Sequence, residues 1–153
     1  MTGSFFLWHN TTIYVKQEAK GMSLKIIQTQ NAPAAIGPYS QAIVTGGMLL
    51  TSGQLGIDPL TNALPEGIEA QTRQSLLNIR AILEEAALEV TDVIKTTVFV
   101  KNMADFPVVN EIYASFFGDH KPARSCVEVS QLPKGGLIEI EVIAQYNKDS
   151  DGK

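Results

Sequence analysis

The chain has 153 residues, of which 44% are hydrophobic and 18% are charged, and this composition fits one globular domain with its own core. Twelve basic and sixteen acidic residues give a formal net charge of −4, which argues against a broad nucleic-acid-binding surface but not against a local anion site. The single cysteine cannot form an intrachain disulfide, which favours a reducing, cytoplasmic compartment. No apolar run approaches the roughly 20 residues of a membrane span, so no membrane partner is expected.

The first residues of the chain differ in character from the rest. The apolar stretch Phe5–Trp8 is too short for a signal peptide, and no basic residue precedes it. Met22, followed by the letters SLK, reads like a second start of translation. We therefore expect residues 1–22 to be an upstream or non-native extension, residues 23–148 to form the domain and residues 149–153 to be a polar tail.

The first half of the domain predicts strands followed by a long helix. A short strand is expected over Ile26–Thr29, and Gly46-Gly47 between two apolar stretches indicates a hairpin. Apolar side chains spaced by three to four residues predict a helix between Glu66 and Leu88. The expected buried stripe of this helix consists of Ile68, Thr72, Leu76, Ile79, Leu83 and Ala87.

The second half continues as strand, helix and two further strands. β-Branched residues predict a strand over Asp92–Asn102, and Asp105 is placed to cap a helix that Gly118 can end. Phe106, Val109, Ile112 or Tyr113, and Phe116 form the stripe that this helix is expected to bury. The last strands are expected over Arg124–Leu132 and Leu137–Tyr146. Together these elements predict an α+β fold, a mainly antiparallel sheet with two helices on one face.

Alternation along the last two strands suggests where a site could lie. Val127 and Val129 alternate with Arg124 and Cys126, and aliphatic residues of the final strand alternate with Glu139 and Glu141. If the helices cover the aliphatic sides, the other face carries the arginine, the cysteine and both glutamates. Such a mixed face suits a subunit interface with a cleft. The alternative is structural: Arg124 and Glu139 form a cross-strand ion pair, and Cys126 fills space in the core.

The sequence lacks the residues that most other kinds of catalytic or binding site require. The two histidines are His9, in the expected extension, and His120, which is expected to be a solvated loop residue. One cysteine and two scattered histidines do not make a zinc site, and no phosphate-binding loop or dinucleotide fingerprint occurs. An anion site remains, because arginine binds carboxylates through parallel N–H···O bonds and a nearby glutamate can activate water.

Several motifs together resemble one family. The stretches NAPAAIGPYSQA, TSGQ, KTTVFVKNMADF, VNEIYASFF and PARSCVEVSQLP with the following IEIEVIA resemble the Rid family, the YjgF-like reactive intermediate deaminases, over about residues 24–146. The resemblance implies a chorismate mutase-like α+β fold and a homotrimer with sites in clefts between subunits. It also implies hydrolysis of 2-iminobutanoate or 2-iminopropanoate, and of their enamine tautomers, to a 2-oxo acid and ammonia, with no cofactor.

The resemblance assigns the central roles to three residues. Arg124 of PARS corresponds to the arginine that binds the substrate carboxylate, and Glu139, the first acid of IEIE, corresponds to the glutamate that orients the attacking water. Cys126 corresponds to a cysteine that lines the pocket without acting as a nucleophile.

Four further residues correspond to the rest of the pocket. Tyr39 of GPYSQA matches an aromatic residue supplied across the interface, Ser52 and Gly53 of TSGQ match backbone contacts, and Asn110 of VNEIY matches a polar residue at the side of the pocket. The chain departs from the family pattern in its N-terminal extension and in the short loop GDHKPARS, which could reshape the pocket mouth.

Two other functions stay open. One is a small-carboxylate-binding regulatory or chaperone-like trimer without turnover, and the other is an endoribonuclease or translation inhibitor. A glutamate beside the arginine favours catalysis over sensing, because binding a carboxylate needs no water-activating acid. The acidic chain disfavours a nucleic-acid partner.

Overall fold

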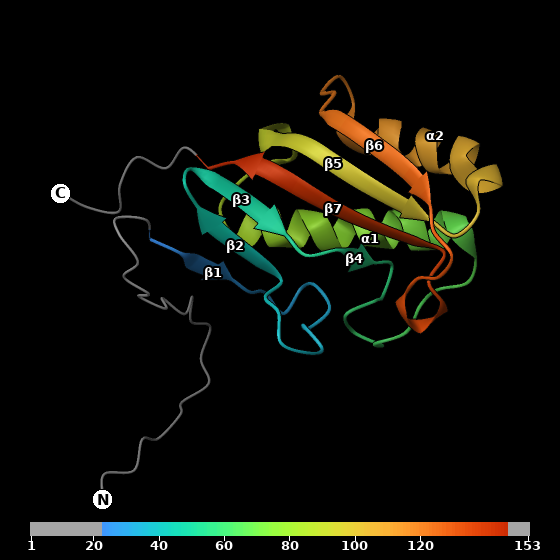
Figure 1. Ribbon diagram of the computed structural model, residues 1–153, viewed down its shortest axis with the longest axis horizontal. Coiled ribbons are helices and arrows are strands. Elements are labelled where there is room, and N and C mark those ends of the chain that lie inside the picture. The colour runs from blue at the N-terminus through green and yellow to red at the C-terminus, as the bar shows by residue number, and fades with distance from the viewer. Residues whose placement is uncertain (1–22, 147–153) are drawn as a thin grey trace, which may run out of the picture.

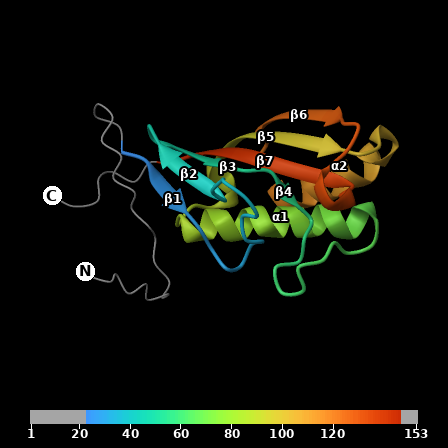
Figure 2. The same cartoon turned by 60° about the horizontal axis from the view of Figure 1, so that its bottom comes forward.

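In the computed structural model, one twisted sheet carries two helices on a single face (Figures 1 and 2). The structure describes residues 23–146, so the predictions for residues 1–22 and for the tail from 149 lie outside it. Within the described part, neither helix is long and apolar enough to cross a membrane.

The sheet has seven strands in the order β1-β2-β3-β7-β5-β6, with β4 paired to β7. All neighbours are antiparallel except β5 and β6, which are parallel. The predicted α+β class, the mainly antiparallel sheet and both helices on one face are therefore confirmed. The strands are β1 (Lys25–Ile27), β2 (Ala42–Thr45), β3 (Met48–Thr51), β4 (Gln54–Leu55), β5 (Val93–Val100), β6 (Ala123–Glu128) and β7 (Ile138–Gln145).

Two α-helices and three short 3₁₀ turns complete the described chain. They are α1 (Gly67–Glu85), α2 (Phe106–Phe117), η1 (Val90–Asp92), η2 (Met103–Asp105) and η3 (Pro133–Gly135). The hairpin between β2 and β3 turns at Gly46 and Gly47, whose φ values of 57° and 75° are left-handed, as the predicted two-residue turn requires.

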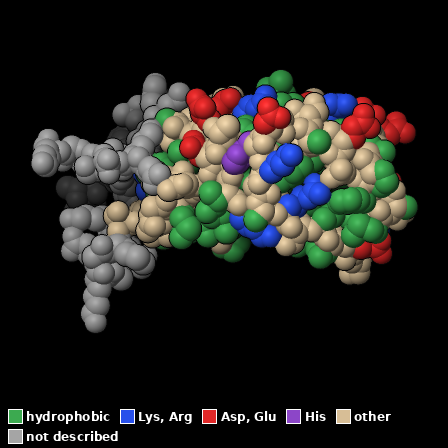
Figure 3. All heavy atoms as spheres, turned by 90° about the horizontal axis from the view of Figure 1, so that it is seen from above, with side chains coloured by type: hydrophobic (Ala, Val, Ile, Leu, Met, Phe, Trp, Pro, Cys, Tyr) green, Lys and Arg blue, Asp and Glu red, His purple; other side chains and the backbone are tan. Residues whose placement is uncertain are grey.

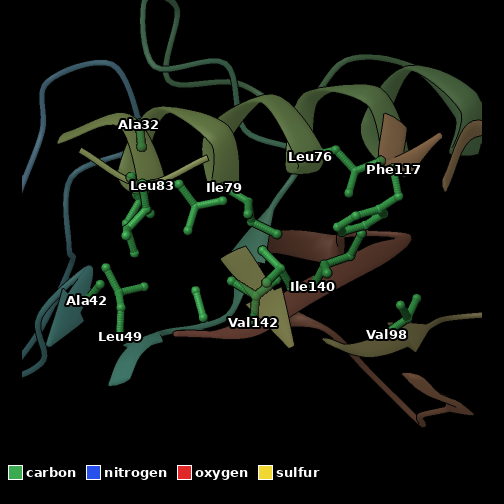
Figure 4. Close-up of a cluster of buried hydrophobic side chains, with 14 of the residues drawn as sticks. Ala32, Ala42, Leu49, Leu76, Ile79, Leu83, Val98, Phe117, Ile140 and Val142 are labelled. Carbon is green, nitrogen blue, oxygen red and sulfur yellow. The ribbon is translucent and has the colours of Figure 1, made fainter. Parts of the chain in front are cut away.

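The core lies between α1 and the sheet. Leu76, Ile79 and Leu83 point from α1 towards the sheet, where Leu83 lies over Leu49 of β3 (Figure 4). These side chains and Ile140 and Val142 of β7 are all buried. The alternation predicted for the last strand is confirmed, because Ile138, Ile140, Val142 and Ala144 are the buried set.

The predicted burial of Ala87 is wrong. The helix ends earlier, and Ala87 adopts a left-handed φ of 53° outside it. The N–H groups of Ala87 and Leu88 donate to the carbonyls of Glu84 and Leu83, which is the Schellman pattern that closes a helix. Leu88 is buried in place of Ala87. An alanine at this position gives no sequence signal, because glycine is the usual residue there.

The second helix begins differently from the prediction. Asp105 stands at the N-cap position, but its side chain makes no capping hydrogen bond. Instead Asn102 Oδ1 accepts the Ala104 N–H at 2.9 Å, and Glu128 Oε2 accepts the Met103 N–H at 2.7 Å. Phe117 is buried, whereas Phe116, which was expected in the buried stripe of this helix, is only half-buried.

A row of buried polar residues on α1 holds the segment around β4. Ser75 Oγ donates to the Gln54 carbonyl at 2.8 Å, and Asn78 Nδ2 donates to the carbonyls of Leu55 at 3.0 Å and Ile57 at 2.9 Å. Because Ser75 and Asn78 are less than a turn apart, both reach the same extended segment. This row fixes the backbone between the sheet and α1, where apolar side chains alone would leave carbonyls unpaired.

We expect Asn78→Ala to lower the free energy of unfolding by about 2–3 kcal/mol, because two buried carbonyls lose their donor. The control is Gln74→Ala, which removes only the half-exposed amide that donates to Asn78 Oδ1 at 2.9 Å. Denaturant unfolding at equal protein concentration measures both. A loss for Asn78→Ala no larger than for the control contradicts the assigned role of the row.

Candidate functional site

The strand β6 faces the opposite way from the prediction. In the parallel pairing with β5, Arg124 lies beside Thr96 and Cys126 beside Val98. Thr96 and Val98 are buried on the helix side, and side chains of directly paired residues share a face. Arg124 and Cys126 therefore lie on the helix side, while Val127 is 43% exposed on the open face.

Glu139 lies on the other face, so the expected grouping of Arg124 and Cys126 with the glutamates is wrong. Strand β5 stands between β6 and β7, with Arg124 level with Val142 and Glu139 level with Val127. Arg124 and Glu139 are therefore two strands apart across the sheet and three residues apart along the strands, which is about 10 Å in each direction. They also lie on opposite faces of the sheet. This separation also rules out the cross-strand ion pair between Arg124 and Glu139.

The arginine half of the site is built by β6 and α2. The Arg124 guanidinium carbon lies 4.6 Å from the ring centroid of Tyr113 and 5.4 Å from that of Phe106. Asn110 follows Phe106 by four residues and precedes Tyr113 by three, so its backbone places it on the same helix face. Figure 3, which shows this side of the molecule, has basic side chains in its middle and acidic ones towards its rim. An overall acidic chain thus carries a local site suited to an anion.

Cys126 lies beside this arginine and packs against the core. Burial raises the pKa of its thiol, and the charge of Arg124 only partly offsets this effect. The thiol is therefore neutral at pH 7, whereas a nucleophilic cysteine needs a lowered pKa. Cys126 is only partly buried and packs against the edge of the core, so it does not fill space within the core as the structural alternative expected.

The glutamate half is a separate cavity of about 510 Å³. Tyr39, Ser52, Gly53 and Glu139 all line it, so the structure brings these four predicted residues together. Ser52 is held by two hydrogen bonds, from its N–H to the Gln41 carbonyl at 2.9 Å and from its Oγ to the Ser40 carbonyl at 2.6 Å. Among the described residues, Arg124, Cys126 and Asn110 are not part of this cavity.

The loop that carries Tyr39 is fixed by a buried glutamine. Gln41 Oε1 accepts the Thr29 N–H at 2.7 Å, and Gln41 Nε2 donates to carbonyls that include Pro33 at 2.8 Å. The Tyr39 hydroxyl accepts the Ile36 N–H at 3.1 Å, and its ring is half exposed. The aromatic side chain thus stands at the mouth of the cavity, available to a ligand or to another subunit.

Glu139 rests directly on Gly53. A Cβ at Gly53 would lie 1.8 Å from Glu139 Oε1, so any side chain there would displace the carboxylate. Burial raises the pKa of Glu139, and the nearby charge of Glu141 raises it further. A carboxyl with a raised pKa can accept a proton from water more readily than an ordinary one, as a general base requires.

His120 is not the solvated loop residue that was expected. Its Nε2 lies 2.6 Å from the Val93 carbonyl and so donates to it, and the ring packs near Phe117 at a centroid distance of 6.2 Å. It therefore has a structural role at the start of β5. No group of three or more His, Cys, Asp or Glu residues within residues 23–146 could hold a metal ion.

Sequence reasoning missed the aromatic contacts of Arg124. Phe106 and Tyr113 were expected only as buried stripe residues of the helix, and Thr96 was not singled out. Their spacing of seven residues around Asn110 was the available signal, since it places both rings on one helix face.

The fold and these residues define a member of a known family. Residues 29–146 match the family described as Endoribonuclease L-PSP. The chain is 57% identical over 123 residues to a Salmonella typhimurium protein named 2-iminobutanoate/2-iminopropanoate deaminase, covering 78% of this chain and 96% of that protein. The chain belongs to this family, and the resemblance to the Rid family is confirmed.

Two solved structures share the fold. Escherichia coli TdcF with bound serine is 48% identical with a TM-score of 0.77, covering 79% of this chain and 98% of that one. YyfA from Yersinia pestis, of the conserved Rid protein family, is 53% identical with a TM-score of 0.79, covering 80% of this chain and 99% of that one.

We expect Glu141→Gln to lower the pKa of Glu139, because a like charge is removed, but to leave it above the usual carboxyl range, because burial is the larger cause. Glu128→Gln is the control, since Glu128 lies on the helix side and caps η2. Titration of the glutamate carboxyl carbons by NMR measures the shift. An unchanged pKa in Glu141→Gln would contradict the assigned cause.

Proposed function

We propose that the chain hydrolyses reactive 2-imino acids, such as 2-iminobutanoate and 2-iminopropanoate and their enamine tautomers, to 2-oxo acids and ammonia. The observation that carries the proposal is that the chain holds both parts this reaction needs, an arginine with free N–H donors and a desolvated glutamate in a cavity. The name of the Salmonella relative supports the substrate, and the serine bound to TdcF supports a small carboxylate ligand. We also place the activity in the cytoplasm, where a lone thiol stays reduced.

We propose further that the complete site forms between subunits of a homotrimer. One chain cannot bring Arg124 and Glu139 to the same small acid, because they lie on opposite faces of the sheet. A second copy could place its arginine half over the glutamate cavity of the first. The open sheet face supports this arrangement, because paired residues form a half-buried apolar row that another copy could cover: Ile26, Ile43, Leu50 and Ile143.

In the proposed mechanism, Arg124 binds the substrate carboxylate through parallel N–H···O bonds. Glu139 of the neighbouring subunit holds a water molecule against C2 and accepts its proton as the oxygen attacks. The C=N π electrons move to nitrogen, which takes this proton back from Glu139 to give a neutral carbinolamine. Glu139 then transfers the hydroxyl proton of the carbinolamine to the same nitrogen. The C–N bond breaks, ammonia leaves and the carbonyl forms, so that one imine and one water yield one 2-oxo acid and one ammonia. Fixing the water against C2 makes the attack effectively intramolecular.

The first test is a coupled assay in which threonine dehydratase generates 2-iminobutanoate and semicarbazide traps the free imine. We expect the wild type to lower trapping and Arg124→Ala to lose about a hundredfold or more in kcat/KM, because two charge-assisted hydrogen bonds are lost. Arg124→Lys is also expected to have a low kcat/KM, because an ammonium cannot bind a carboxylate in bidentate fashion. Cys126→Ser is the matched control and should keep substantial activity.

Three outcomes of this assay would point elsewhere. A folded, assembled wild type that leaves trapping unchanged would indicate a binding protein rather than an imine deaminase. An inactive but folded Cys126→Ser would overturn the assignment of the thiol as a non-nucleophile. Cleavage of RNA that survives Arg124→Ala and falls steeply with salt would favour the activity in the family's description.

The proposed shared site makes a second prediction about mixed oligomers. Arg124→Ala and Glu139→Gln are each expected to be inactive alone, but mixing them with subunit exchange should restore activity. In an equal mixture, a cleft is intact when a chain with Arg124 meets a chain with Glu139, so about a quarter of the wild-type activity should return. Native mass spectrometry verifies the exchange. Verified mixed trimers without activity would show that one chain supplies both residues.

A further inference from the structure

We infer that Tyr113 and Phe106 are positioning residues that fix the plane of the Arg124 guanidinium, and that Thr96 fixes Tyr113 in turn. The inference deepens the proposed function, on which its catalytic readout rests. It concerns how a carboxylate is recognised at the arginine half of the site, which lies within one chain.

The Arg124 guanidinium lies against two aromatic rings. Its carbon lies 4.6 Å from the Tyr113 ring centroid and 5.4 Å from the Phe106 ring centroid. Among the described residues, Arg124 has no ion pair and no side-chain hydrogen bond. An arginine stacked on rings uses its flat face, while its N–H donors point outwards in the plane. The rings of Tyr113 and Phe106, here called the aromatic platform, therefore orient the guanidinium and leave its N–H donors free for a carboxylate.

A hydrogen bond holds Tyr113, whose ring is the closer of the two to the guanidinium. The hydroxyls of Thr96 and Tyr113 lie 2.8 Å apart, and Thr96 is fully buried. Thr96 is also the β5 residue directly paired with Arg124. One backbone position on β5 thus sets both the origin of the arginine side chain and the place of the ring beneath its end.

This arrangement matters because β6 is an edge strand. An arginine there has no strand on its outer side to limit its rotamers, and a flexible side chain loses conformational freedom when it binds. Rings that hold the guanidinium before binding reduce this entropic cost. Their loss should weaken carboxylate binding more than it slows the chemical step, because Glu139 and its water are left unchanged.

The chain offers a matched control on the same helix. The Arg80 guanidinium carbon lies 4.7 Å from the ring centroid of Phe116. This second cation–π pair has nearly the same distance as the pair of Arg124 and Tyr113, but it does not include Arg124. Phe116→Leu removes a ring of α2 that also packs against the core. It therefore reports the structural effect of losing such a ring without touching the platform.

The experiment measures the Kd of 2-oxobutanoate by calorimetry, together with KM and kcat, for Tyr113→Leu, Phe106→Leu, Tyr113→Phe and Phe116→Leu. We expect Tyr113→Leu to raise Kd and KM by about tenfold with kcat within about threefold, from the usual strength of a cation–π contact. Phe106→Leu should show a smaller rise. Tyr113→Phe keeps the ring but loses the hydrogen bond to Thr96, so Kd should rise by about threefold, less than in Tyr113→Leu. Phe116→Leu should leave Kd and KM unchanged.

The role of Thr96 is tested by a double-mutant cycle. Thr96→Val and Tyr113→Phe each break the same hydrogen bond, so their effects on Kd should not add in the double variant. Additive effects would overturn the assigned link between Thr96 and Tyr113.

Two results would overturn the platform itself. One is an unchanged Kd in folded Tyr113→Leu and Phe106→Leu, and the other is an equal rise in Phe116→Leu. Calorimetry separates this inference from the proposed function, because 2-oxobutanoate binding does not require turnover. If the wild type binds the acid but does not hydrolyse the imine, the proposed function fails while the platform is still tested.

Discussion

The pairing of β5 with β6 on one side and β7 on the other is the constraint on which the site depends. Because paired residues share a face, the register of β5 decides where every neighbouring side chain points. Thr96 directs Arg124 to the helix side, while Phe99 lies beside Glu139 on the open side. A shift of β6 by one residue would exchange the faces of Arg124 and Val127 and separate the arginine from its rings.

The same sheet keeps two different electrostatic environments apart. On the helix side, a guanidinium lies over aromatic rings beside a thiol whose pKa burial raises. On the open side, Glu139 is desolvated against Gly53 and near Glu141, which raises its pKa. In the proposed trimer these environments meet, and the arginine of one subunit would offset the charge that the glutamate of another holds in a partly dry cleft.

Buried polar side chains position the backbone around the glutamate half of the site. Ser75 and Asn78 bind carbonyls around β4, and Gln41 binds the loop that carries Tyr39. Loops that line a cavity expose their backbone groups, and these buried side chains satisfy them without filling the cavity. The helix α1 thus stabilises the fold with its apolar stripe and shapes the site with its polar row.

The sequence by itself determined the types of the main elements, the buried side of β7 and the glycine hairpin, and motifs that resemble the Rid family named the candidate residues of the site. These are local properties, because alternation, helical spacing and turn residues act within a few positions. Only the tertiary structure decided which side of β6 faces the helices and that β5 separates Arg124 from Glu139. Strand order depends on pairing between distant segments, and the valines of an edge strand can face the open side as readily as the core. The order β5-α2-β6 was the one available signal, because a strand–helix–strand unit favours a parallel pair, and that pairing directs Arg124 to the rings of α2.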